Sequence, residues 1–346
     1  MLGVLTALSG CLRSSGDQDD YQVLPSLYEL QQKKIERIQA LNKSSNRHVN
    51  GEYVIPKRVH TSPTQSGYGE TLLFSRNASV RIVGDIGFHV NHLVGRLTSD
   101  KSDQPLVLDN PQSFSIDVLQ GDITLSPKAV EAILNEHIFN FLTSTLKQLR
   151  VSIEGDLLVM NGFVKRKGAW IPFTLKGSFS IKNGRFLVLH AKEVLMDGDS
   201  ATKLLRVAKI ELDELLTIKA PGAELKGSSI WLDTRKLLPP PQINFLVNQV
   251  AVTPAGVNLK LKTLRKAAYP NLMVQRDSYI VIRSGDMRIM RLLTLNSEFN
   301  IVPRQADERL DFSFYDYRKQ ISQGSLKLLK NGGAVAFVQN YKYLEK

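Results

Sequence analysis

The residues best suited to chemistry in this 346-residue chain are its histidines and a serine that follows an aspartate. His89 and His92 stand three residues apart in a strand-like segment, a spacing that turns two side chains to opposite faces and disfavours a shared metal ion. Asp199-Ser200 could suggest a hydrolase nucleophile, but no glycine follows at the elbow position, so a helix cap is the better interpretation. With no phosphate-binding loop either, we expect no enzyme, no metal and no cofactor.

Cys11 is the single cysteine, which excludes an internal disulfide. It ends an uncharged stretch, and residues 8–11 (Leu-Ser-Gly-Cys) resemble a bacterial lipobox. The resemblance implies cleavage before Cys11 and its acylation, which would give a stable membrane anchor. We therefore expect residues 1–11 to be a signal peptide whose basic start lies upstream of Met1, and residues 12–24 to be a polar tether. The alternative is a buried segment with an incidental cysteine.

The chain is basic, with 45 Lys and Arg against 33 Asp and Glu, so a nonspecific partner should be anionic. Two clusters are the candidate contacts for anionic head groups or a membrane surface; they are Lys165, Arg166 and Lys167 at an expected hairpin tip, and Lys260, Lys262, Arg265 and Lys266 near the end of a strand. The alternative is an ordinary solvated surface. Nucleic acid is not an expected partner, because no RNA-binding signature or helix-turn-helix spacing accompanies the charge.

The spacing of apolar residues predicts one long helix. Ser126 and Pro127 form a helix start, and apolar residues then recur at helical spacing, which predicts an amphipathic helix over residues 129–149. Weaker helical patterns cover residues 25–41 and 200–216.

Alternating apolar residues predict strands on both sides of the long helix. The clearest alternation runs from Ile171 to Ile181 and leads into Asn183-Gly184, a strong hairpin signal. Further strand candidates are residues 86–94, 114–118, 186–189, 245–252, 257–261, 279–282, 299–302 and 312–315. This order of elements predicts an α+β fold.

Residues 126–261 resemble a bacterial member of the tubular lipid-binding (TULIP) superfamily, similar to the domain family that includes the mycobacterial lipomannan elongation protein. The segments that carry the resemblance begin SPKAVEAILNEHIFNFL, PFTLKGSFSIKNGRF and LLPPPQINFLVNQV. The resemblance implies a long amphipathic helix wrapped by a strongly curved antiparallel sheet that encloses an apolar groove. We expect this domain to span residues 71–262, preceded by a helix and loop (25–70) and followed by a β-rich C-terminal appendage (263–346).

If such a groove exists, eight large apolar residues are its expected wall; they are Ile133, Phe139, Phe141 and Leu142 of the helix and Phe173, Phe179, Leu187 and Leu189 of the meander. The alternative is that they form a solid core.

The expected function is that of a cell-envelope lipoprotein which binds or shuttles a lipid or lipid-linked glycan without catalysis. The alternative is a structural or interaction lipoprotein with a filled core and a basic surface for an envelope protein partner, and an enzyme of unrecognised type comes third. The expected location is the periplasmic side of the envelope. Leu12 replaces the aspartate that retains enteric lipoproteins in the inner membrane, which favours the outer membrane.

Overall fold

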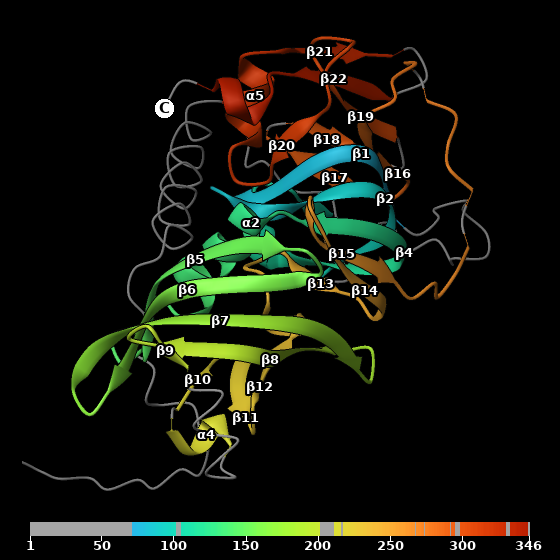
Figure 1. Cartoon of the computed structure of the whole chain (residues 1–346). Helices are drawn as coiled ribbons and strands as arrows, with labels where there is room; N and C mark the ends of the chain where they lie inside the picture. Colours follow the sequence, from blue (N-terminus) through green and yellow to red (C-terminus); the bar gives the residue numbers. More distant parts are fainter. Residues whose placement is uncertain are drawn as a thin grey trace, which may run out of the picture.

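A computed structural model describes residues 71–101, 105–200, 211–215, 217–266, 268–272, 274–290, 292–294, 298–329 and 333–344. Cys11, the tether and the helix predicted over residues 25–41 therefore lie outside the described residues, as does most of the helix predicted over 200–216. In Figure 1 a large sheet occupies the upper part of the molecule and a second sheet, built around a meander, lies below it.

The large sheet joins residues from both ends of the described chain. In spatial order its strands are β14 (Val247–Thr253), β15 (Gly256–Leu261), β4 (Phe114–Leu125), β2 (Ile86–Ser99), β1 (Thr71–Val83), β16 (Tyr279–Arg283), β19 (Glu298–Pro303), β22 (Ala334–Val338) and β21 (Ser325–Leu328), with β13 (Gln242–Asn244) parallel to β4 and β20 (Asp311–Ser313) parallel to β1. The segment expected as a C-terminal appendage thus supplies β16, β19, β20, β21 and β22 to the same sheet as β1.

The second sheet, called the meander sheet below, is built mainly from consecutive antiparallel strands. In spatial order these are β10 (Lys219–Ala220), β11 (Ala223–Lys226), β12 (Ser229–Asp233), β8 (Phe186–Met196), β7 (Ala169–Lys182), β6 (Leu157–Arg166) and β5 (Leu146–Glu154), with β9 (Asp199–Ser200) beside β8. A small third sheet contains β18 (Leu292–Thr294), β17 (Met287–Ile289) and β3 (Leu106–Val107). The helical segments are η2 (Pro111–Ser113), α2 (Pro127–Ala132), η3 (Ile133–Ile138), α4 (Leu212–Leu215), η4 (Thr234–Lys236), α5 (Tyr317–Ser322) and η5 (Tyr341–Tyr343).

The predicted α+β fold with a long amphipathic helix is wrong. Strands make up 58% of the structure and helices 12%, and the helix expected over 129–149 is a twelve-residue segment formed by α2 and η3. Its start is as predicted, because Ser126 Oγ accepts a hydrogen bond from the Ala129 N–H at 3.1 Å and Pro127 follows. It ends in a wide π-helical turn closed by Phe139 N–H donating to Leu134 O at 2.8 Å.

The error has a local cause in β5. Leu146 and Leu149 lie three residues apart, as on a helix, but both are buried positions of a strand with a bulge between them. Gln148 adopts a φ of 52° there, and the extra residue converts the usual spacing of two into three. The intervening sequence NFLTST (residues 140–145) is rich in residues that form helices poorly, which was the available signal.

β5 is the end strand of the meander sheet. Side chains of the short helix form hydrogen bonds with the backbone groups on its outer edge. Asn135 accepts a hydrogen bond from the Leu149 N–H at 2.9 Å and donates one to the Leu149 carbonyl at 2.7 Å. One helical turn earlier, Glu131 accepts from the Val151 N–H at 3.1 Å and contacts Arg150 Nη1 at 2.7 Å. The amide and the carboxylate therefore take the place of a neighbouring strand.

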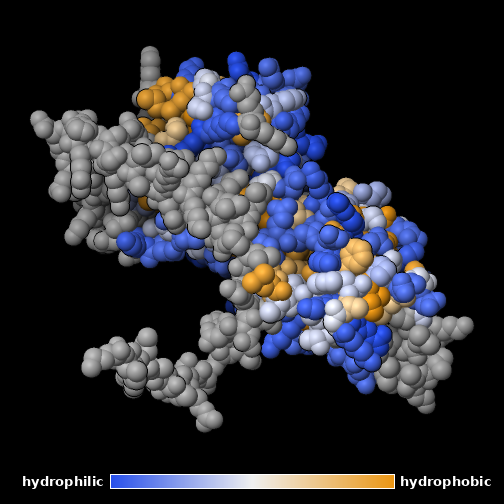
Figure 2. Space-filling view, turned by 90° about the vertical axis from the view of Figure 1, so that its left-hand side faces the viewer, coloured by the Kyte–Doolittle hydropathy of each residue, from blue (hydrophilic) through white to orange (hydrophobic). Residues whose placement is uncertain are grey.

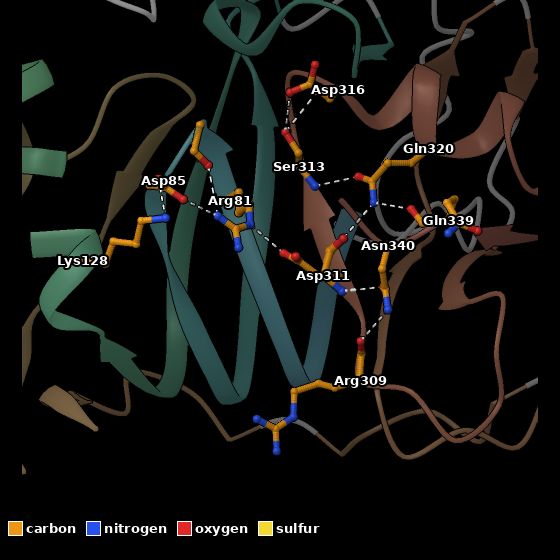
Figure 3. A network of polar contacts seen from close by, with 11 residues as sticks. Arg81, Asp85, Lys128, Arg309, Asp311, Ser313, Asp316, Gln320, Gln339 and Asn340 are labelled. Atoms are coloured by element: carbon orange, nitrogen blue, oxygen red, sulfur yellow. Dashed lines mark hydrogen bonds and ion pairs between the residues drawn. The ribbon is translucent and has the colours of Figure 1, made fainter. Parts of the chain in front are cut away.

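A similar arrangement joins the C-terminal strands to β1 (Figure 3). Arg81 on β1 donates to Asp311 on β20 at 2.7 Å and to Asp85 at 2.9 Å, and Asp85 also pairs with Lys128 at the start of α2. Gln320 on α5, fully buried, accepts from a β20 N–H and donates to the Asp311 carbonyl, both at 2.7 Å. These contacts attach β20 to β1, and α5 to β20.

One hydrophobic core includes residues of the large sheet, of the meander sheet and of the short helix. A separate cluster on the large sheet contains Phe74, Val94, Leu119, Tyr279, Val281, Val302 and Val335 and is partly covered by Tyr269, Leu272 and Val274. The large sheet therefore has apolar side chains packed on both faces.

Replacing Asn135 tests how much its two hydrogen bonds to the backbone of Leu149 on β5 stabilise the fold. Asn135→Ala should lower the free energy of unfolding by about 2–6 kcal/mol, because it leaves two partly buried backbone groups without partners at about 1–3 kcal/mol each. Urea denaturation measures this change. Asn161→Ala is the matched control, since Asn161 is exposed on β6 and its side chain accepts a surface hydrogen bond from Thr174. Equal losses from the two variants would contradict the assignment.

Candidate functional site

A cleft of about 720 Å³ lies where the turn between β7 and β8 meets the large sheet. We call it the inter-sheet cleft. Its lining comes from β2, β4 and the segment before β14 on one side, and from the β7–β8 turn, Asp233 and η4 on the other. The lining residues are Arg96, Asp117, Val118, Leu119, Arg185, Asp233, Arg235, Lys236, Gln242, Asn244, Phe245, Leu246 and Leu264.

The predicted Asn183-Gly184 hairpin is confirmed and forms one wall. Both residues have positive φ, 53° and 68°, as a tight turn between antiparallel strands requires. The Gly184 carbonyl accepts a hydrogen bond from the Val247 N–H at 2.7 Å, which fastens the turn to the beginning of β14. Arg185 follows immediately, so the turn positions its guanidinium in the cleft.

Arg185 forms a two-pronged ion pair with Asp233. Its Nε contacts Asp233 Oδ1 at 2.9 Å and its Nη2 contacts Oδ2 at 2.5 Å. Asp233 also accepts from the Arg235 N–H at 3.1 Å and so caps η4. The Arg185 hydrogen bonds, followed by the opposing effect of burial, leave the pKa of Asp233 below its ordinary value, so the carboxylate is charged at neutral pH.

The opposite wall carries a second polar network. Asp117 on β4 accepts from Arg96 Nη2 and from Asn244 Nδ2, each at 2.9 Å. Gln242 donates to the Arg235 carbonyl at 3.0 Å, which links this wall to η4. The network fixes the polar lining without using Lys236.

The cleft is cationic and amphipathic. Its lining contains four Arg or Lys side chains and two carboxylates, each carboxylate already paired with an arginine. Arg235 and Lys236 are exposed, and among the described residues no acidic side chain lies within ion-pair distance of either. Leu246 and Leu264, the latter 56% exposed, add apolar surface, so the cleft can receive an anion that carries an apolar group.

The predicted cations lie in two separate places. Lys260, Lys262, Arg265 and Lys266 are all exposed. Leu264, which lies between them in the sequence, lines the cleft, but none of the four cations does. Residues 165–167 form the β6–β7 tip, as expected, at the opposite end of β7. The structure therefore places neither of the two predicted clusters in the lining of the cleft.

Most residues of the predicted groove wall are core residues. Ile133, Phe139, Phe141, Phe173, Leu187 and Leu189 are buried, and Phe179 is partly buried against the same core. Leu142 is 59% exposed. None of the eight lines the inter-sheet cleft, and their role as a lipid groove stays a prediction.

A second cleft, of about 460 Å³, lies beside the network of Figure 3. His89, Asn91 and Arg309 line it together with Arg81 and Asp85. Burial, and then the nearby charge of Arg309, lower the pKa of His89, so its imidazole is neutral near neutral pH. Since Arg81 and Asp85 are engaged in holding the C-terminal strands, this cleft is a less suitable binding site.

Sequence reasoning missed Arg185, Asp233, Arg235 and Asn244. Asp233 and Arg235 could have been identified as a helix cap and the second residue of the helical turn that it caps. The Arg185–Asp233 pair could not, because it joins residues 48 apart. The described residues hold no cluster of three or more His, Cys, Asp and Glu suited to a metal ion. None of the helices in the described segments is long and apolar enough to cross a bilayer.

Comparisons with protein families, with characterised proteins and with solved structures yield no match to this chain. The TULIP resemblance therefore stays a prediction, and the long helix that it implies is not present among the described residues.

Asp233→Asn tests the ion pair through its pH dependence. A carboxylate with a lowered pKa stabilises the fold above its unfolded pKa, ordinarily 3.8, and loses this contribution as the pH falls through the lowered value. The variant should lose about 1–3 kcal/mol at pH 7, and the difference from the native chain should shrink below about pH 4. Denaturation over a pH series measures it, with exposed Asp156→Asn as control; a loss that is constant with pH would contradict the assignment.

Proposed function

We propose that this chain is a non-catalytic envelope lipoprotein that binds the anionic head group of a lipid or lipid-linked glycan in the inter-sheet cleft. The observation that carries the proposal is the combination, in one cleft, of exposed Arg235 and Lys236 with the exposed apolar side chain of Leu264. A cationic cleft with an apolar rim suits a phosphate or carboxylate head group whose first chain carbons rest on the leucine.

The predicted lipid anchor supports the location in this proposal. Acylation at Cys11, followed by the polar residues 12–24, would hold the body near the outer membrane on its periplasmic side. A cleft that takes only a head group would leave most of each acyl chain in the bilayer or on a carrier, in keeping with the buried positions of the predicted groove residues.

A second candidate function is that of an interaction lipoprotein whose basic surface binds an acidic envelope protein. The filled core around Phe139, Phe141 and Phe173 favours it. It differs from the first proposal in requiring no affinity for a lipid.

Titration with a soluble lipid tests the first proposal. The full chain carrying Cys11→Ser should bind short-chain phosphatidylglycerol more tightly than phosphatidylcholine with the same chains. Arg235→Glu with Lys236→Glu should weaken binding by at least about tenfold, since a hydrogen bond to a charged group contributes about 1.5–3 kcal/mol. Calorimetry measures both affinities.

Two controls make this experiment decisive. Lys192→Glu with Lys327→Glu reverses the same number of exposed charges on β8 and β21, outside the cleft lining, and should leave binding unchanged. Leu264→Gln, which removes the apolar contact without adding charge, should weaken the binding of phosphatidylglycerol but not that of glycerol phosphate. Equal affinity for both lipids, or equal effects of the two charge reversals, would reject the head-group site and favour the protein-partner function.

The anchor is tested separately. When the full gene is expressed in a bacterial host with labelled palmitate, the native chain should carry the label and Cys11→Ser should not, because Cys11 is the only thiol. An unlabelled native chain would exclude the lipoprotein part of the proposal while leaving the cleft intact.

A further inference from the structure

The hairpin between β6 and β7 projects beyond both of its neighbours. The register with β5 ends at Val164, with one further hydrogen bond from the Lys165 N–H to the Thr145 carbonyl at 2.8 Å, and the register with β8 ends at Phe173. Beyond these points Arg166 and Ala169 still pair with each other. Positive φ values at residues 167 and 168 (49° and 86°) close the tip with a tight two-residue turn. In Figure 1 the hairpin reaches out at the left of the meander sheet.

One face of this hairpin combines aromatic rings with cations. Lys147 Nζ lies 4.1 Å from the centre of the Trp170 ring and 5.8 Å from that of Phe163, and Lys165 Nζ lies 5.9 Å from Trp170. Trp170 nevertheless remains 36% exposed. Such contacts hold the indole in one orientation with part of its ring open.

The tip is also free of acidic residues in its own sequence. Residues 163–170 read FVKRKGAW, with three cations and no carboxylate, and Lys147 adds a fourth cation. Asp197 lies in the β8–β9 turn and Asp199 begins β9, but Asp197 donates its N–H to the Pro172 carbonyl and so lies further back along β7. Figure 2 views the molecule from this side and shows hydrophilic side chains interspersed with small hydrophobic groups.

We propose that the β6–β7 tip docks on an anionic lipid bilayer, with Trp170 at the level of the head groups and Lys165, Arg166 and Lys167 against their phosphates. Tryptophan is favoured at the membrane–water boundary, because one part of its ring is apolar and its N–H is polar. Cations near an anionic surface add attraction that salt weakens. A narrow, protruding tip also suits a flat surface better than it suits a groove.

This surface is distinct from the inter-sheet cleft. The 14 residues of β7 separate the tip from the β7–β8 turn by about 43 Å at about 3.3 Å per residue. Docking at one end of β7 therefore leaves the cleft at the other end open.

Vesicle binding tests the proposal with the full chain carrying Cys11→Ser, so that no acyl anchor contributes. The protein should sediment with vesicles containing about 30% phosphatidylglycerol and much less with pure phosphatidylcholine. Lys165→Ala with Lys167→Ala should weaken partitioning by about 25-fold, at about fivefold for each cation. Lys192→Ala with Lys327→Ala, which removes two exposed lysines from β8 and β21, is the matched control.

Fluorescence then tests the position of the indole. The chain has two tryptophans, so Trp231→Phe leaves Trp170 as the only one. Its emission should shift to shorter wavelength on the anionic vesicles and become protected from acrylamide. Equal partitioning of the two lysine double variants, unshifted Trp170 emission on bound vesicles, or equal binding to both vesicle types would overturn the proposal. Lys165→Ala with Lys167→Ala, which lie outside the cleft lining, should leave the titration with soluble short-chain phosphatidylglycerol unchanged, and this separates the test of the tip from that of the cleft.

Discussion

The outward peptide groups of β5 must find hydrogen-bond partners, and the arrangement of the meander sheet depends on how they do so. Among the described strands only β6 pairs with β5, so Asn135 and Glu131 supply the missing partners for Leu149 and Val151. Because an unpaired buried peptide group is costly, this requirement fixes the short helix against the strand. The helix then directs Ile133 and Ile138 into the core, and β5 sets where the meander begins.

β7 connects the β6–β7 tip with the inter-sheet cleft, and both surfaces carry exposed cationic side chains. At one end a tight turn projects Trp170 and its lysines, and at the other end the Asn183-Gly184 turn is fastened to β14 and holds Arg185 in the cleft. Arg185 is largely neutralised by Asp233, and Arg96 is paired with Asp117. The paired arginines therefore build the cleft, while Arg235 and Lys236 supply its exposed charge.

Local signals in the sequence were sufficient for the parts of the fold that depend on neighbouring residues. The Ser126-Pro127 helix start, the alternation from Ile171 to Ile181 and the turn at residues 183–184 all appear where the sequence places them. The prediction of a long helix was wrong because a bulge at Gln148 separates Leu146 and Leu149 by three residues, a spacing typical of a helix. The cleft could not be predicted, because its ion pairs and lining join segments that only the folded sheets bring together.

Two amide side chains hydrogen-bond to strand backbones in the same way. Gln320 accepts from an N–H of β20 and donates to a carbonyl of β20, as Asn135 does on β5. An open strand edge is a template on which another chain can add, and it is a common starting point for aggregation. A side chain that occupies both the donor and the acceptor of such an edge leaves nothing for a foreign strand to pair with. The same two amides that complete the fold thus also keep copies of the protein from joining edge to edge at these positions.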